Sequence, residues 1–154
     1  MLTISGEWEE SVDNTIDRMA GHLIRRLHQI SNAVFQERMK QAGFDLTSVQ
    51  FAALAAIAQT PRIDQASLAA QIAYDRATIG GVVDRLEAKG LVTRTARKTD
   101  RRAREVSLTG QGEAVLQEVT PIIEALQGDI LSGLSDEERQ HFLQLARKAA
   151  IGAG

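Results

Sequence analysis

The chain has 154 residues, 44% of them hydrophobic, and this length and apolar content predict one globular domain with a substantial core. It has no cysteine, which excludes disulfides, thiolate metal clusters and thiol-based redox sensing. The formal net charge is −2, the first residues are acidic and no apolar run is long enough to cross a bilayer, so we expect a cytoplasmic protein without a secretory signal.

Helical periodicity dominates the first half of the chain. A long helix is predicted over residues 11–42, where apolar residues recur every three or four positions. These residues are Ile16, Met19, Ala20, Leu23, Leu27, Ile30 and Val34. A glycine then breaks the pattern, and a second helix begins near Thr47 and ends near Pro61. A short third helix, capped by Asp64, is predicted over 65–72.

A fourth helix and a basic β-hairpin follow. The helix covers 76–89 and stops at Gly90, the position of a C′ glycine. Its apolar face consists of Ile79, Val82, Val83 and Leu86. Residues 91–96 and 104–109 are predicted strands around a turn. Residues 91–105 hold six basic and two acidic residues, a net charge of +4, and the rest of the chain after them has a net charge of −4. The hairpin can therefore meet a polyanion that the C-terminal segment would repel.

Two helices complete the chain. Thr109 is a candidate cap for a long helix over 112–134, which we expect to bend at Pro121 because a backbone donor is missing there. The last helix begins at Ser135, whose spacing to Glu138 matches a capping box. The residues that it is expected to bury are Phe142, Leu145, Ala146 and Ala149.

The order of these elements predicts a mainly α-helical protein with a small β-hairpin. Two short helices joined by a tight turn and followed by a basic hairpin are the pattern of a winged helix-turn-helix. A helix fits the major groove of DNA, and a hairpin tip with arginines reaches the narrower minor groove. A basic turn alone would indicate only a solvated loop, but the helix pair before it favours DNA binding.

Residues 75–112, "DRATIGGVVDRLEAKGLVTRTARKTDRRAREVSLTGQG", resemble the core of the MarR family of bacterial transcription regulators. The likeness lies in the helix end "VDRLEAKGLVTR" and the wing "DRRAREVSLTGQG", and the order of helices around them also matches over nearly the whole chain. The resemblance implies a homodimer with two winged helix-turn-helix lobes on a palindromic operator. It also implies repression in most members, and often release by a small ligand.

The fourth helix presents a nearly bare outward face. Its expected DNA contacts are Arg76, Ala77, Thr78, Gly81 and Arg85, with Gly80 also directed outward. Many family members carry larger polar side chains here, so base readout should be modest and phosphates and groove shape should supply more of the affinity. The two glycines either let the helix backbone approach DNA closely or are tolerated on an exposed face.

The hairpin supplies the remaining predicted DNA contacts. Asp100 and Arg102 match the family's paired acid and base, which implies that Asp100 orients an arginine while Arg101 or Arg102 enters the minor groove. Asp100 is alternatively a simple turn residue. The basic residues assigned to phosphates are Arg94, Arg97, Lys98 and Arg104, although each alone fits a solvated side chain equally well.

The apolar stripes on the first and last helices exceed what the winged lobe can cover. Burying apolar surface is worth about 25 cal/mol per Å², which favours packing of these stripes against a second copy of the chain. The alternative is an extended monomer whose stripes stay exposed. We therefore divide the chain into an N-terminal dimerisation helix (1–42), a DNA-binding lobe (43–109) and C-terminal dimerisation helices (110–154), which form one compact unit.

One flank of the first helix has the composition of a ligand site. Met19, His22 and Arg26 lie together beside the apolar stripe, and an arginine with an imidazole suits an anionic aromatic whose carboxylate Arg26 would grip. Alternatively, Arg26 snorkels and His22 pairs with a carboxylate across the dimer. The resemblance implies a cleft for phenolic or benzoate-type acids. Its opposite wall would consist of Phe44, Phe51 and Leu54, unless these residues serve the core.

Other classes of function have less support. The three histidines lack metal-ligand spacing, and no phosphate-binding glycine loop or nucleophile motif is present, so we expect no catalysis, no cofactor and no metal site. The alternative to a sequence-specific regulator is an architectural DNA-binding protein that ignores sequence and has no ligand.

Overall fold

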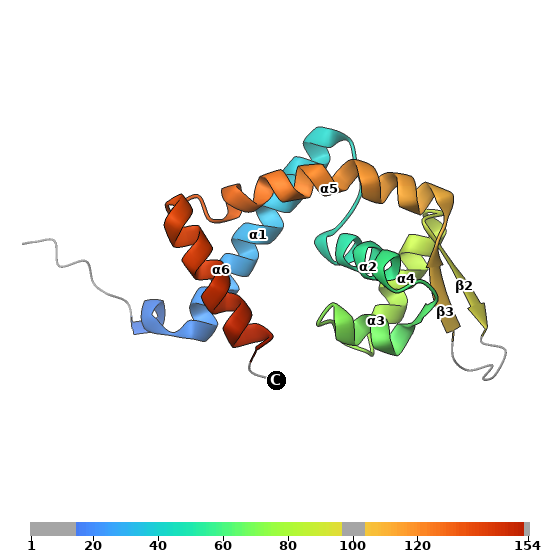
Figure 1. Ribbon diagram of the computed structural model, residues 1–154, viewed down its shortest axis with the longest axis horizontal. Coiled ribbons are helices and arrows are strands. Elements are labelled where there is room, and N and C mark those ends of the chain that lie inside the picture. The colour runs from blue at the N-terminus through green and yellow to red at the C-terminus, as the bar shows by residue number, and fades with distance from the viewer. Residues whose placement is uncertain (1–14, 97–103, 153–154) are drawn as a thin grey trace, which may run out of the picture.

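The computed structural model describes residues 15–96 and 104–152. Figure 1 shows two groups of elements, with α1 and α6 in one group, α2, α3, α4 and the sheet in the other, and α5 running from the sheet to α6. The elements are a 3₁₀ helix Thr15–Arg18, α1 Ala20–Ala42, α2 Ser48–Gln59, β1 Ile63–Asp64, α3 Gln65–Gln71, α4 Ile79–Ala88, β2 Val92–Ala96, β3 Arg104–Leu108, α5 Gly110–Ile130 and α6 Asp136–Ala150. No helix in these two ranges is long and apolar enough to cross a membrane.

The predicted caps Asp64, Thr109 and Ser135 are confirmed, and Thr47 caps α2, which was predicted to begin there. Thr47 and Ser135 each form a capping box, and the side chains of Asp64 and Thr109 accept hydrogen bonds from the backbones of α3 and α5. Gly90 has a φ of +75°, which confirms it as the left-handed residue that ends α4. The α5 helix runs unbroken past Pro121.

The first helix is shorter than predicted. It begins at Ala20, because Met19 is extended (φ −93°, ψ 123°) and separates α1 from the 3₁₀ helix. Apolar periodicity continues through Ile16 and Met19 and therefore conceals this break. Residues 11–14 of the predicted helix lie outside the described part of the chain.

The fourth helix also starts later than predicted, at Ile79. The side chain of Asp75 accepts a hydrogen bond from the Ala77 backbone (2.9 Å), and its carbonyl accepts one from the Thr78 hydroxyl (3.2 Å). These bonds hold residues 76–78 in a turn, with Thr78 as the N-cap.

The hairpin is confirmed and belongs to a three-stranded antiparallel sheet in the order β1-β3-β2. β3 is the central strand, and Val106 pairs with Ile63 on one side and Arg94 on the other. The two-residue strand β1 was not predicted, since two residues show no alternation.

The core continues from the lobe into α1 and α5. Leu54, Leu68, Leu86 and Val106 are fully buried in the lobe, and the same cluster includes Met39, Val119 and Leu126 from the longer helices. Because α5 begins against the hairpin and shares this core with α2, its first turns are fixed relative to the DNA-binding lobe.

The predicted burial of the α6 stripe is wrong for the single chain. Leu145 is 53% exposed, Ala149 is exposed, and Phe142 and Ala146 are only half-buried. Neighbouring elements of the described chain cover this face only in part, and Phe142 lines a crevice together with residues of α1 and α5. The other large apolar residues exposed around the two terminal helices are Ile16, Met19, Leu23, Ile24, Ile30, Leu143 and Ile151.

Candidate nucleic-acid interface

The outward face of α4 and the turn before it form one exposed surface. Arg76, Ala77, Thr78, Gly81 and Arg85 are all exposed, as a contact surface for DNA requires. Arg76 and Ala77 lie in the turn and Thr78 is the cap, so only Gly81 and Arg85 are on the helix itself.

The two adjacent glycines have different surroundings. Gly80 is half-buried, and a Cβ there would lie 3.8 Å from Gln65 Nε2 of α3, so the prediction that it faces outward is wrong. A Cβ at Gly81 would have no atom within 4 Å. Packing within the chain therefore gives no reason for a glycine at position 81.

Arg94 holds the wing strand β2 against the helix pair. Its side chain is 13% exposed, and its guanidinium donates to Asp84 and Glu87 of α4 (3.2 Å to Glu87) and to Gln65 of α3 (3.1 Å). Burial acts to lower the pKa of Arg94, but the hydrogen bonds and charges of the two carboxylates outweigh it and raise this pKa. The terminal nitrogens of Arg94 are therefore engaged inside the lobe, and its Nε is buried without a hydrogen-bond partner among the described residues, while its assignment to a phosphate stays a prediction.

A second basic residue has a similar internal role. Lys89, at the end of α4, donates to Gln50 Oε1 (3.0 Å) and to the Asp45 carbonyl, and lies 3.5 Å from the Asp45 carboxylate. Gln50 is buried and also receives the Thr47 backbone N–H of the capping box. This cluster fixes the C-terminal end of α4 to the start of α2.

The rest of the predicted wing contacts cannot be placed. Arg97, Lys98, Asp100, Arg101 and Arg102 lie outside the described residues, so their roles stay predictions. Arg104 is exposed on β3. Sequence reasoning missed Arg62, whose guanidinium pairs with Glu105 of β3 at 2.8 Å beside the short strand β1.

A family model of MarR matches residues 46–103, the lobe that contains this surface. The transcriptional regulator HosA of Escherichia coli O157:H7 is 37% identical over 134 residues, which cover 87% of this chain and 96% of HosA. The chain belongs to the MarR family. The transcriptional repressor NicR of Pseudomonas putida is 36% identical over 140 residues, covering 89% and 87% of the two chains.

The MarR fold extends over both groups of elements. The structure of Bordetella bronchiseptica BpsR, whose DNA binding is regulated by 6-hydroxynicotinic acid, matches with a TM-score of 0.79 and 32% identity and covers 88% of this chain and 95% of BpsR. Regulators of this family are dimeric and are not enzymes.

The residues predicted to bind a ligand do not meet within one chain of this MarR protein. Met19 and Arg26 are exposed near the start of α1, and His22 Nε2 lies 3.5 Å from Asp17 of the same chain. α2 packs against the other end of α1, where Phe51 lies beside Phe35 with ring centroids 6.5 Å apart. His22 is thirteen residues from Phe35, about 20 Å along the helix at about 1.5 Å per residue.

For the predicted opposite wall of that cleft, the structure shows the alternative that the sequence left open, which is packing in the core. Leu54 is 0% exposed and belongs to the core, and Phe44 and Phe51 are half-buried against it. These three residues stabilise the lobe, which leaves the flank of α1 as the part of the predicted site that is open to solvent.

Proposed function

We propose that this MarR-family protein is a dimeric, sequence-specific DNA-binding repressor that a small anionic aromatic ligand releases from its operator. The observation that carries the DNA-binding part is the junction at Arg94. It joins the wing strand to α4 and α3, so that the exposed helix face and the hairpin act as one rigid unit. Since its target is bacterial DNA, we place its action in the cytoplasm.

The arrangement of α4 and the wing determines the proposed DNA contacts. Arg76 and Thr78, at the start of α4, reach base edges or phosphates in the major groove, and Arg85 reaches the backbone from the next turns. The wing tip enters the adjacent minor groove. With so few long polar side chains on α4, phosphate contacts supply most of the affinity, which should fall steeply with salt.

The exposed stripes of α1 and α6 support the dimer. Large apolar side chains gather on these two helices, and covering them with a second copy places two recognition units on successive major grooves. A palindromic operator then matches the twofold symmetry of the protein.

The proposed effector site is the flank at the start of α1 that His22 and Arg26 form together with Met19, the residue just before the helix. Arg26 would bind the carboxylate, and the exposed apolar residues beside it would contact the ring. Because this flank borders the proposed dimer interface, we propose that the partner subunit supplies the opposite wall. The regulation of BpsR by an aromatic carboxylic acid and the naming of NicR as a repressor support this chemistry and this role.

The test compares a duplex from upstream of the protein's own gene with a scrambled duplex of equal length, by fluorescence anisotropy over a range of salt. We expect preference for the native duplex, loss of binding on addition of 6-hydroxynicotinate or benzoate, and no such loss in Arg26→Ala. Equal affinities for both duplexes at every salt concentration would instead indicate an architectural protein. A mutant that responds to the acids as the wild type does would rule out Arg26 as the carboxylate ligand.

A further inference from the structure

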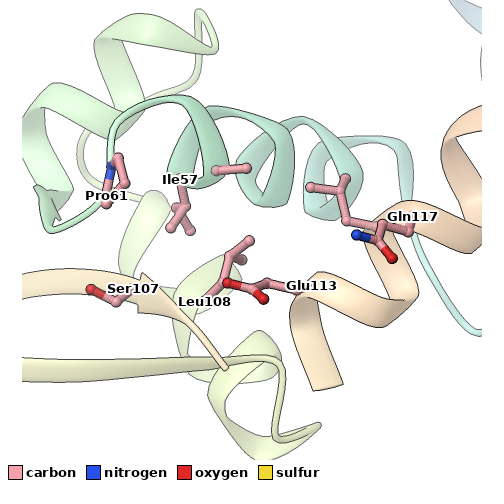
Figure 2. Close-up of a pocket in the computed structure, with 8 residues that line it drawn as sticks. Ile57, Pro61, Ser107, Leu108, Glu113 and Gln117 are labelled. Atoms are coloured by element: carbon pink, nitrogen blue, oxygen red, sulfur yellow. The ribbon is translucent and has the colours of Figure 1, made fainter. Parts of the chain in front are cut away.

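A crevice of about 330 Å³ opens where the second half of α2, the end of β3 and the first turns of α5 meet (Figure 2). Its apolar walls include Ile57, Leu108 and Leu116, and its polar groups are Ser107, Glu113 and Gln117. In Figure 2 Ile57 points from α2 toward Leu108, and the Glu113 carboxylate lies beside Leu108. This combination of apolar walls and a few polar groups is typical of small-molecule sites.

The crevice is separate from the proposed effector site. None of Met19, His22, Arg26, Phe44, Phe51 and Leu54 lines it, and α1 contributes no residue to it. It lies instead within the DNA-binding half, between the wing strand and the helix that leads to the C-terminal part of the chain.

The charge in the crevice defines the ligand chemistry. Glu113 is exposed, and within residues 15–96 and 104–152 its carboxylate has no hydrogen bond or ion pair. No lysine or arginine of the described residues lines the crevice. An ionised carboxylate only accepts hydrogen bonds, whereas the Gln117 amide and Ser107 hydroxyl both donate and accept. We propose that the crevice binds a small protonated amine on a compact apolar body, with Glu113 as its counter-ion and the aliphatic wall against its body.

The location of the crevice allows a bound ligand to affect the DNA-binding surface. β3 pairs with both other strands, and Thr109, directly after the crevice residue Leu108, donates to the Gly90 carbonyl at the end of α4 (2.6 Å). A ligand in the crevice contacts α2, the wing strand and α5 together, so its binding changes the freedom of the wing relative to α4. The effect of the ligand on DNA binding rests on the proposed function, but the binding of an amine in the crevice does not.

The test is a titration of the purified full-length protein with benzylamine, followed by NMR of labelled isoleucine and leucine methyl groups without DNA. We expect saturable shifts at Ile57, Leu108 and Leu116, and much weaker binding of benzyl alcohol, which has a similar size and no charge. Glu113→Gln keeps the shape of the side chain and removes its charge, and it should weaken benzylamine binding about three- to tenfold.

Glu118→Gln is the matched control, because Glu118 is an exposed residue of the same helix that does not line the crevice. It should bind benzylamine as the wild type does. Equal affinity of Glu113→Gln and wild type, or shifts spread over surface methyls without saturation, would overturn the proposal. Because no DNA is present, a failure of operator binding would count against the proposed function and leave this result unaffected.

Discussion

At the scale of single residues, Arg94 determines how the wing is held. Arg94→Met keeps an unbranched apolar stem and removes every donor to Asp84, Glu87 and Gln65. We expect a loss of about 1–2 kcal/mol in the free energy of unfolding, since charged hydrogen bonds at a mostly buried site are lost while the two carboxylates stay hydrated. Operator affinity should fall about tenfold because the wing is no longer fixed to α4. Urea unfolding and fluorescence anisotropy measure the two effects.

Arg85→Gln is the control for that experiment. Arg85 is exposed on α4 and has no role in the junction, so its replacement should change stability by less than about 0.5 kcal/mol and still weaken DNA binding. If Arg94→Met leaves stability unchanged and Arg85→Gln does not, the roles assigned to the two arginines are reversed.

Gly81 allows the two interpretations of the bare helix face to be separated. A Cβ at this position has open space within the chain, so Gly81→Ala should stabilise α4 by about 0.5–1 kcal/mol. We expect operator affinity to fall severalfold in the same variant, because the methyl group would stand between the helix backbone and DNA. Thermal unfolding and anisotropy test this prediction, and unchanged affinity would mean that Gly81 is merely tolerated.

The basic residues illustrate what the sequence can and cannot reveal at this scale. Clustering of positive charge in the hairpin was visible in the sequence. Arg94 nevertheless resembled its basic neighbours in the sequence. Only the fold, by placing β2 beside α4, distinguishes the arginine that stabilises the lobe from those that remain exposed.

At the scale of elements, the start of α5 depends on one close contact with the hairpin. A Cβ at Gly112 would lie 2.0 Å from the Leu91 carbonyl oxygen, which is a backbone atom and cannot move aside. Gly112→Ala should therefore lower the free energy of unfolding by about 1–3 kcal/mol through overpacking. Gly110→Ala, two residues earlier with nothing within 4 Å, should be neutral or slightly stabilising. Chemical unfolding of the two variants provides the comparison, and equal stabilities would contradict the contact.

The predicted elements were accurate where local chemistry marks their ends. Side-chain caps at Thr47, Asp64, Thr109 and Ser135 fixed four helix starts. The start of α1 was misplaced because Met19 offers no capping oxygen and the apolar period continues across the break. The strand β1 was missed because it pairs with β3, more than forty residues away in the sequence.

At the scale of the whole molecule, the apolar stripes of the terminal helices stay exposed in the single chain. The sequence predicted these stripes and the need for a second copy, but it could not show that α6 buries no side chain within its own chain. α6 follows α5 at the end of the molecule away from the sheet (Figure 1). We therefore expect a second copy of the chain to bury α6.

The dimer prediction uses two of these exposed side chains. Leu143 on α6 and Leu23 on α1 are 51% and 42% exposed, and replacing both with glutamate places unpaired carboxylates in the proposed interface. Because burying an unpaired charge costs several kcal/mol, dimerisation should weaken about a hundredfold or more, and operator affinity should fall with it. Gln59→Glu, at an exposed position on α2, adds a charge outside the stripes and should leave the dimer intact. Sedimentation velocity over a range of concentrations measures the effect, and a wild-type protein that stays monomeric, or a double mutant that dimerises normally, would show that the stripes have another partner.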